Sequence, residues 1–192
     1  MNHMPHCYEM IVEMMEEVSR RKDPYNHHGA KVSTLCLKMA GRLVVPPSAQ
    51  ELEILGHGAS LHDIGKMFLA DILLNFPRRL TRAEMLAVRT HAQQGFELVL
   101  ALDYHKIICD IVRYHHENWN GTGYPLGLTG ENIPLFARMV RVADTFDAMT
   151  SSRAYRKAAS WKDARMLINA ESGSTFDPQM VALLNFVLEE EG

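Results

Sequence analysis

Ten of the 192 residues are histidine, and most of them stand in short motifs beside aspartate, lysine or glycine. Two of these motifs are pairs: His62 with Asp63, and His115 with His116. Neighbouring residues of a helix point about 100° apart, so amphipathic packing gives no reason to bury both members of a pair. Imidazole and carboxylate groups held together inside a protein are common ligands of Fe, Mn, Co, Ni or Zn ions. The chemistry that these motifs suggest is metal binding.

Taken singly, each of these residues has an ordinary explanation. A histidine–aspartate pair arises by chance or caps the end of a helix, and one helical histidine such as His91 is more often a hydrogen-bonded core residue than a ligand. The interpretation changes for the whole set, because its members lie at or near the ends of several predicted helices and a helical bundle can bring them to one interior point. Asp63 has two oxygens and is the predicted bridge between two metals. The set comprises His28, His62, Asp63, His91, His115, His116 and Asp144.

The composition is that of a folded domain without a strongly charged partner. The chain is long enough for one domain with a sizeable core, and its 47% hydrophobic and 22% charged residues are typical of globular proteins. The formal net charge of -3 provides no basic field, so we expect no DNA or RNA partner. No apolar run approaches the ~18 residues of a membrane span, so we expect no membrane association.

The N-terminus and the cysteines predict the compartment. The opening MNHMPHCYEM has no basic start followed by an apolar stretch, and so it does not resemble a secretory signal. Cys7, Cys36 and Cys109 are an odd and widely spaced set without a CxxC pair. Such a set is typical of a reducing compartment and excludes a thiolate zinc site. We therefore expect a cytoplasmic protein.

Helices must position these side chains, because apolar residues recur at helical spacing and no segment alternates as a strand does. Capping boxes mark two helix starts, at Ser48 with Glu51 and at Thr81 with Glu84. A glycine-rich loop is predicted over 117–133. The predicted helices cover about 6–21, 28–43, 48–62, a segment from 81 that carries His91, 94–102, 104–116, 134–150, 160–168 and 177–190. We expect a single all-α domain, a helical bundle with a metal site in its interior.

Several stretches resemble the motifs of one family, the HD-GYP domain, which is a branch of the HD phosphohydrolases. The leading stretch HGAKV is similar to the first histidine motif of the family and selects His28 over His27. A lone HD pair is weak evidence, whereas HDIGK followed by HHENWNGTGYP is specific. The resemblance covers residues 23–192, and residues 1–22 are predicted to be a linker or dimerisation helix. The remaining stretches are HAQQG at 91–95, RVADTFDAMTSSRAYRKA at 141–158 and GSTFDP at 173–178.

The resemblance implies an enzyme of bacterial signalling. Family members hydrolyse the second messenger cyclic di-GMP, to linear pGpG or further to GMP, with two divalent metals. Fe or Mn is the expected metal, with Ni, Co or Zn as alternatives. Two metals about 3.5–4 Å apart would bind a bridging water and supply hydroxide at neutral pH. By resemblance the first metal would be held by His28, His62, Asp63 and Asp144, and the second by Asp63, His91, His115 and His116.

Four residues are predicted to contact the substrate. Lys66 follows Asp63 closely and is placed to bind a phosphate oxygen; the alternative is a solvated lysine. Arg153 and Arg156 match basic positions of the family, and arginine suits phosphate, but a solvated basic loop is the alternative. Tyr124 is predicted to stack on guanine. Trp119 has the same option, with loop support as its alternative, while Asp147 is expected to brace the loop rather than to bind metal.

The sequence also departs from the family pattern. Asn118 and Asn120 stand where many relatives have arginine and aspartate, and Phe76 where relatives often have lysine. Some relatives bind a third metal through a glutamate one turn before the leading histidine. Here that position is Pro24, which has no side-chain donor and breaks a helix, and Asp23 would need an irregular loop to reach inward. We therefore expect two metals.

Two other functions fit part of the pattern. One is a docking module whose GYP loop binds a diguanylate cyclase (GGDEF) domain with little catalysis, although the filled ligand positions argue against an inactive enzyme. The other is a generic HD nucleotide phosphohydrolase, against which the intact GYP segment weighs. The helix over 6–21 is predicted to pair with a second chain or to continue an upstream region, with packing on its own domain as the alternative.

Overall fold

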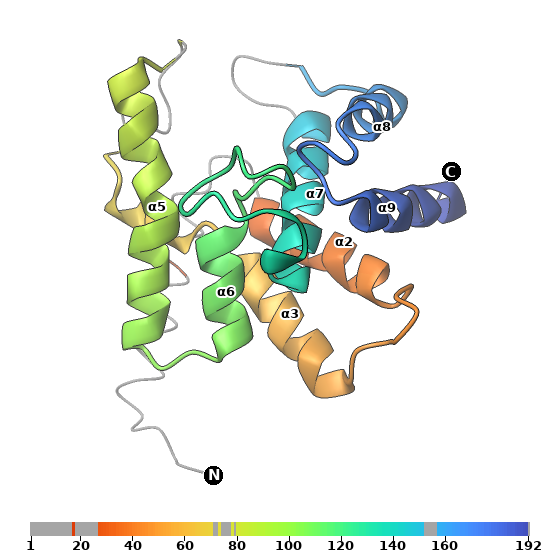
Figure 1. The fold of residues 1–192 in the computed structure, drawn as a ribbon, viewed down its shortest axis with the longest axis horizontal. Helices are drawn as coiled ribbons and strands as arrows, with labels where there is room; N and C mark the ends of the chain where they lie inside the picture. Colours follow the sequence, from red (N-terminus) through yellow and green to blue (C-terminus); the bar gives the residue numbers. More distant parts are fainter. Residues whose placement is uncertain are drawn as a thin grey trace.

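The computed structural model describes residues 17, 27–70, 73, 78, 80–151 and 157–191. All regular elements in this part of the chain are helices, so the all-α prediction is confirmed (Figure 1). The predicted helix over 6–21 lies outside the described residues, apart from position 17. The elements are α2 (His28–Ala40), α3 (Ala49–Leu61), η1 (Ile64–Phe68), α5 (Arg82–Ala101), α6 (Lys106–Tyr114), η2 (Gly130–Asn132), α7 (Leu135–Thr150), α8 (Trp161–Ala170) and α9 (Pro178–Glu191).

The helices enclose two neighbouring hydrophobic cores. The larger core lies among α2, α3, α7, α8 and α9 and contains fully buried residues such as Val32, Val140 and Leu184. The smaller core lies among α3, η1, α5 and α6 around Val99 and Val112. In Figure 1, α5 and the α8–α9 pair stand on opposite sides of the central helices α2, α3 and α7. The two cores meet where α3 ends, and the HD motif lies at that junction.

Both predicted capping boxes form at the start of their helices. The Ser48 hydroxyl accepts a hydrogen bond from the backbone N–H of Glu51 at 3.2 Å, and the Glu51 carboxylate accepts one from the Ser48 N–H at 2.8 Å. Thr81 and Glu84 make the same reciprocal pair at the start of α5. These caps satisfy backbone donors that have no partner within the helix, and so they fix where α3 and α5 begin.

The predicted break between two helices near residue 94 is wrong, because α5 runs without interruption from Arg82 to Ala101. Gly95 looks like a helix breaker in the sequence, but it serves close packing. A Cβ atom on Gly65 would lie 1.9 Å from the carbonyl oxygen of His91 and 2.7 Å from the Gly95 nitrogen. The two glycines therefore let η1 touch the backbone of α5, which brings the HD motif next to His91.

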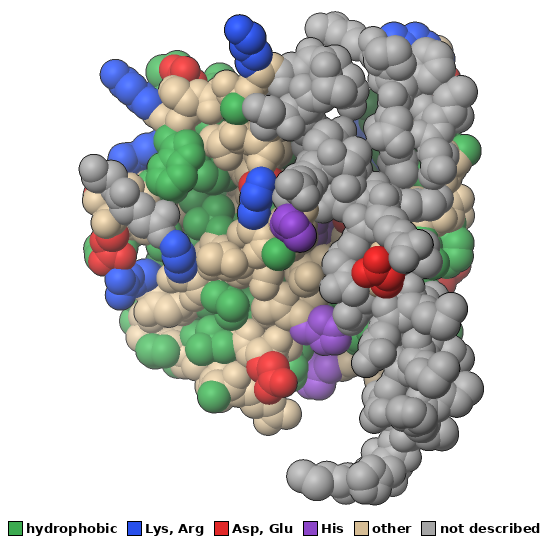
Figure 2. All heavy atoms as spheres, turned by 180° about the vertical axis from the view of Figure 1, so that it is seen from behind, with side chains coloured by type: hydrophobic (Ala, Val, Ile, Leu, Met, Phe, Trp, Pro, Cys, Tyr) green, Lys and Arg blue, Asp and Glu red, His purple; other side chains and the backbone are tan. Residues whose placement is uncertain are grey.

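Two smaller differences concern helix ends. α2 stops at Ala40, three residues before the predicted end at 43, and Gly41 caps it with backbone hydrogen bonds to Leu37 and Met39. The residues after the HD pair form the separate 3-10 helix η1, which periodicity did not predict. A search of the described residues finds no helix with the length and hydropathy of a membrane span. On the face shown in Figure 2, basic, acidic and apolar side chains of these residues are interspersed.

Candidate metal centre

The structure brings together all seven residues that the sequence predicts as metal ligands. Side-chain atoms of Asp63, His91, His115 and His116 lie within 4.8 Å of one another, and so do atoms of His28, His62 and Asp63. The carboxylate of Asp144 completes the second group, with Oδ1 3.0 Å from the Nε2 atom of His28 and 3.9 Å from that of His62. Asp63 belongs to both groups. The cluster is therefore able to bind metal, and the role of each residue as a ligand stays a prediction.

Helix ends place most of these side chains. His28 is the first residue of α2, His62 directly follows α3, and His115 and His116 directly follow α6. His91 and Asp144 differ, because they lie within α5 and α7. Three helix ends and two helix faces thus point at one interior position, an arrangement by which helical bundles can build metal sites between their helices.

Three buried histidines share one tautomer. The Nδ1 atom of His62 lies 2.8 Å from the Ala59 carbonyl oxygen, that of His91 2.7 Å from Val88, and that of His115 3.0 Å from Val112. A carbonyl oxygen can only accept, so Nδ1 carries the proton in each ring and Nε2 carries a lone pair. Hydrogen bonding of the outer nitrogen is the arrangement by which proteins orient metal-binding imidazoles. All three Nε2 lone pairs are directed at Asp63.

His28 and its two carboxylates form what we call the acid-paired half of the centre. Its Nε2 atom lies 3.0 Å from Asp144 Oδ1, and its Nδ1 atom lies 2.6 Å from Asp147 Oδ2. Burial opposes a charged imidazole, but the hydrogen bonds to Asp144 and Asp147 outweigh it and raise the pKa of His28 to about 10. Burial acts against the Asp144 carboxylate as well, yet His28 and His62 hold the pKa of Asp144 well below its usual range. This half is a hydrogen-bonded ion pair.

His91, His115 and His116 form the imidazole half. Burial lowers the pKa of His115 to about 4, against the effect of the nearby Asp63 carboxylate. Burial, together with the neighbouring His115 and His91, lowers the pKa of His116 well below 6.5. The rings lie against one another, with centroids 4.1 Å apart for His115 and His116. His115 and His116 are therefore neutral imidazoles at neutral pH.

The buried acceptor atoms at the centre indicate whether a cation would fit there. The Nε2 atoms of His91 and His115 are 3.3 Å apart, although both carry lone pairs when their Nδ1 atoms are protonated. The Nε2 atom of His62 and the Oδ1 atom of Asp63 are buried without a hydrogen-bond partner. Unpaired buried acceptors are costly, and a cation would satisfy all of them at once. The donor set of nitrogen and carboxylate oxygen fits divalent transition metals.

Asp63 is the residue of the described centre that belongs to both ligand groups, and Lys66 binds it. The Lys66 ammonium group donates to Asp63 Oδ2, while Asp63 Oδ1 lies 3.2 Å from the Nε2 atom of His91. Burial acts to raise the pKa of Asp63, but the charge of Lys66 and the contact with His62 hold it well below its usual range. Lys66 therefore lies at the centre as predicted, and its contact here is to Asp63.

Tyr124 is also brought to the centre. Its ring stacks on His116 with centroids 4.7 Å apart, and the Arg89 guanidinium lies 5.0 Å from its centroid. Burial raises the pKa of the Tyr124 hydroxyl, so it remains a hydrogen-bond donor. Trp119 is held by a backbone hydrogen bond to Thr175, which favours loop support as its role. Arg153 and Arg156 lie outside the described residues, as do Asp23, Pro24 and Phe76.

Sequence reasoning missed the role of Glu117, the residue after the histidine pair. Its buried carboxylate accepts hydrogen bonds from the backbone N–H groups of Leu126, Gly127 and Leu128 at 2.7, 3.1 and 3.1 Å. These three hydrogen bonds hold residues 126–128 next to Glu117, where the loop begins. A Cβ atom on Gly123 would lie 2.3 Å from the Asn118 nitrogen, so the turn also requires glycine there. An acidic residue at the start of a glycine-rich loop was the available signal.

The sequence also assigned Asp147 only a bracing role. In the structure its carboxylate accepts hydrogen bonds from the Nδ1 atom of His28 at 2.6 Å and from the Ser151 hydroxyl at 3.1 Å. It braces the end of α7, as predicted, and it also fixes the ring of His28. The spacing to Asp144, nearly one helical turn, was the signal that both carboxylates could meet the same imidazole.

Comparison with known proteins identifies one family. Residues 13–180 match the family described as HD domain. The chain is 39% identical over 165 residues to a cyclic di-GMP phosphodiesterase of Pseudomonas aeruginosa, in an alignment that covers 84% of this chain and 39% of the relative. It is 29% identical over 178 residues to the 3'3'-cGAMP-specific phosphodiesterase 2 of Vibrio cholerae, which covers 92% of this chain and 34% of the relative.

The solved structures agree on the fold. An HDG"Y"P protein from Bdellovibrio bacteriovorus is similar with a TM-score of 0.70 at 22% sequence identity, over 95% of this chain and 60% of that chain. At this identity the likeness concerns the fold alone. The chain spans only 39% and 34% of the length of the two curated relatives.

Proposed function

The chain belongs to the HD domain family, and from this premise we propose that it is a metal-dependent phosphodiesterase that opens cyclic di-GMP to linear pGpG. The resemblance of the sequence to the HD-GYP branch is confirmed by the matches to curated cyclic di-GMP phosphodiesterases. The observation that carries the proposal is the set of inward-directed Nε2 lone pairs around the shared carboxylate of Asp63. Such a set suits a bound cation, and a pair of cations is a common catalyst for phosphodiester hydrolysis.

We propose that the two halves hold one divalent metal each. His28, His62 and Asp144 would bind the first, His91, His115 and His116 the second, and Asp63 both. Bound there, the metals would lower the pKa of a water molecule and neutralise charge on the phosphodiester. Fe or Mn is the proposed identity, because imidazole and carboxylate without thiolate suit these ions, with Ni, Co or Zn as alternatives.

The residues of the chain would contribute orientation and charge. The backbone carbonyls of Ala59, Val88 and Val112 hold three imidazoles in the tautomer that presents Nε2. Lys66 would move from Asp63 to a non-bridging phosphate oxygen when substrate and metals are present, because the metals would then share the charge of that carboxylate. The Tyr124 hydroxyl, which burial keeps protonated, would donate a hydrogen bond to the substrate.

Arg153 and Arg156 remain proposed phosphate contacts on the strength of the sequence resemblance. The guanidinium group forms paired hydrogen bonds with phosphate oxygens. A substrate with two phosphodiesters would be held at one by the metal centre and at the other by arginine.

The proposed partners and compartment follow the same resemblance. We propose the GYP loop as a contact for a GGDEF-domain protein; the loop exposes Leu126 to 54% and is fixed by Glu117 and by the hydrogen bonds to residues 174–175. The segment 1–22 is proposed to pair two chains or to join an upstream region. The cytoplasm is the proposed compartment, and it suits the free thiols of Cys36 and Cys109.

Product chromatography tests the proposed reaction. The purified chain, loaded with Fe(II) or Mn(II) under anaerobic conditions, should convert cyclic di-GMP to pGpG, and 3'3'-cGAMP and cyclic di-AMP serve as competing substrates. The expected outcome is faster cleavage of cyclic di-GMP than of either competitor. Faster cleavage of 3'3'-cGAMP would keep the reaction class and correct the substrate. No cleavage of any cyclic dinucleotide with any of the five metals would reject the proposal.

A further inference from the structure

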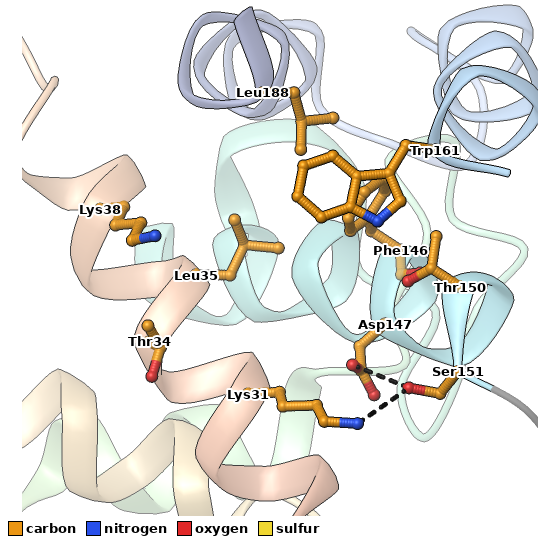
Figure 3. A pocket seen from close by; sticks show the side chains of 10 residues that line it. All are labelled: Lys31, Thr34, Leu35, Lys38, Phe146, Asp147, Thr150, Ser151, Trp161 and Leu188. Atoms are coloured by element: carbon orange, nitrogen blue, oxygen red, sulfur yellow. Dashed lines mark hydrogen bonds between the residues drawn. The ribbon is translucent and has the colours of Figure 1, made fainter. Parts of the chain in front are cut away.

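Helix α7 carries four charged side chains, and they differ in their partners. Three of them form ion pairs with described residues: Arg138 with Asp177, and both Asp144 and Asp147 with His28. Figure 3 shows Asp147 beside a cavity between α2 and α7, where its carboxylate also accepts a hydrogen bond from the Ser151 hydroxyl. The fourth, Arg141, meets no carboxylate of the described residues at ion-pair distance, and its hydrogen-bond partners are neutral.

The partners of the Arg141 guanidinium are a side-chain amide and a hydroxyl. Its Nε and Nη2 atoms donate to the Oδ1 atom of Asn118 at 3.2 and 3.0 Å, and its Nη1 atom donates to the Thr145 hydroxyl at 2.9 Å. A guanidinium group has five N–H donors, so one N–H on each terminal nitrogen has no acceptor within the described part of the chain. Two such N–H groups can bind two phosphate oxygens.

The charge of Arg141 is kept at a cost. Burial lowers the pKa of its guanidinium, and the nearby Asp144 carboxylate opposes this decrease only in part. The Phe176 ring, with its centroid 5.4 Å from the guanidinium carbon, adds a cation–π contact. A buried charge without an ionic partner is destabilising, and proteins retain such groups mainly at functional sites. An anionic ligand would supply the missing partner.

Arg141 lies at the edge of the metal centre. It precedes Asp144 by nearly one turn of α7, and its hydrogen bonds to Asn118 join this helix to the GYP loop. Burial and the Asp63 carboxylate raise the pKa of the Tyr124 hydroxyl, and the positive charge of Arg141 opposes the increase. The guanidinium therefore lies within electrostatic range of both the shared carboxylate and the tyrosine that stacks on the imidazole half.

We propose that Arg141 binds a phosphodiester group of the substrate through its two remaining N–H groups, and that Asn118 orients it for this contact. A neutral acceptor fixes the guanidinium and leaves its charge for the substrate. Many relatives have arginine at position 118, and an arginine could not accept these hydrogen bonds. The assignment rests on the proposed function, because it adds a substrate contact to the same centre.

Nuclear magnetic resonance of the guanidinium N–H groups tests the anion site without metal or turnover. The metal-free protein is titrated with dimethyl phosphate, a phosphodiester anion, and with trimethyl phosphate, its neutral counterpart. Arg141→Lys and Arg138→Lys assign the two sets of signals. We expect dimethyl phosphate to shift the Arg141 signals to saturation and to leave those of Arg138, which is paired with Asp177, unchanged. Unmoved Arg141 signals, or equal shifts with trimethyl phosphate, would overturn the anion site.

Calorimetric titration of the Zn²⁺-loaded protein tests whether the anion is the substrate. The probe is a phosphorothioate analogue of cyclic di-GMP, which resists hydrolysis. Arg141→Lys should weaken its binding by about tenfold, the effect of losing paired hydrogen bonds to an anion. Arg138→Lys is the matched control on the same helix and should stay within about twofold of the parent. Equal affinities of the two variants would reject Arg141 as the contact.

The two titrations separate failure of this assignment from failure of the proposed function. If dimethyl phosphate binds at Arg141 but the parent protein does not bind the analogue, the anion site stands and cyclic di-GMP is rejected as the substrate. If the parent binds the analogue and Arg141→Lys binds it equally well, the proposed substrate stands and the assignment of Arg141 is wrong.

Asn118→Asp tests the role of the neutral acceptor. The carboxylate has nearly the shape of the amide and would form the ion pair that Arg141 lacks. The urea midpoint should therefore rise, while the affinity for dimethyl phosphate should fall by about tenfold. Asn120→Asp is the control, because Asn120 is an exposed residue of the same loop that binds Thr122. Equal phosphate affinities of the two variants would reject the orienting role of Asn118.

Urea unfolding separates a substrate contact from a structural one. Arg141→Met should keep or raise the urea midpoint, because it removes a buried charge that has no ionic partner. Arg138→Met should lower the midpoint, because it leaves the buried carboxylate of Asp177 without its arginine. A decrease for Arg141→Met as large as that for Arg138→Met would assign Arg141 to the structure and overturn the proposal.

Discussion

The acid-paired half and the imidazole half of the metal centre differ in the carboxylates that their histidines meet. His28 lies between Asp144 and Asp147, which together raise its pKa to about 10. His115 and His116 are buried beside other imidazoles, and the pKa of His115 falls to about 4. The first half can therefore hold a proton where the second cannot. A metal bound as proposed in the acid-paired half would therefore have to displace a proton from His28, whereas a metal bound at His115 and His116 would displace none.

Asp63→Asn should have the largest effect, because Asp63 is the carboxylate that both halves share. The variant removes a charge from each proposed metal site, so we expect metal content to fall from two ions per chain towards none. Hydrolysis of cyclic di-GMP should fall by at least about 10³-fold, the loss expected for a group that stabilises the transition state directly. Metal analysis and product chromatography measure the two quantities. Asp110→Asn is the control, because Asp110 of α6 pairs with Lys106 and belongs to neither ligand group, and it should match the parent.

Gly65→Ala should disrupt the close contact between η1 and α5, which places Asp63 next to the imidazole half. The added Cβ would lie 1.9 Å from the carbonyl oxygen of His91, so η1 must separate from α5. We expect the free energy of unfolding to fall by about 3 kcal/mol, at the upper end of overpacking penalties. Gly41→Ala is the control, since the nearest atom to its Cβ is 3.6 Å away, and it should stay within about 1 kcal/mol. Urea unfolding measures the stability of both variants. Equal free energies of unfolding for Gly65→Ala and Gly41→Ala would contradict the close packing of η1 on α5.

Asp147→Asn should weaken the acid-paired half alone. The amide keeps the shape of the side chain but loses the charge that holds the Nδ1–H group of His28 at 2.6 Å. Loss of such an orienting carboxylate costs about 10–100-fold in metal affinity. Mn²⁺ titration should therefore show one weakened site and one unchanged site. Equal weakening of both sites would contradict the division of the centre into two halves.

The metal-free protein should show opposite pH dependences for the two halves. His28 has a raised pKa in the folded state, so its contribution to stability is complete below 6.5 and is lost as pH rises to about 10. His115 has a lowered pKa, so the stability of its neutral form is present above 6.5 and is lost as pH falls to about 4. Melting temperatures of the chelated protein should fall on both sides of neutrality. His28→Gln should reduce only the fall in melting temperature at alkaline pH. His115→Gln should reduce only the fall in melting temperature at acidic pH.

The sequence predicted the helix starts and the clustered residues whose placement depends on local chemistry. Capping boxes at Ser48 and Thr81 fix helix starts through residues three positions apart, so they are visible without the fold. All of the clustered histidines except His91 adjoin helix ends, and a bundle brings helix ends together. These two facts, with the motif order of the HD-GYP branch, were enough to predict an all-α domain and the seven clustered residues.

Features that depend on contacts across the fold could not be predicted in this way. A separate helix was predicted from residue 94, whereas α5 is continuous there and Gly95 contacts Gly65 of η1, an approach between two elements that the sequence does not encode locally. Asp147 meets His28 across 119 positions of sequence. Glu117 accepts hydrogen bonds from the backbone N–H groups of residues 126–128. Because nearly every residue type has this group, the sequence of 126–128 does not reveal the contact. Each miss is a packing or backbone contact that only the folded chain creates.

An anomalous-scattering map of Mn-replete crystals tests the central claim most directly. We predict two peaks about 3.5–4 Å apart, with one Asp63 oxygen at each, His28 and Asp144 at the first peak and His91, His115 and His116 at the second. A single peak would contradict the division into two metal-binding halves. Two peaks without Asp63 between them would contradict its role as the bridge, and a third full peak beside residues 23–27 would contradict the metal count.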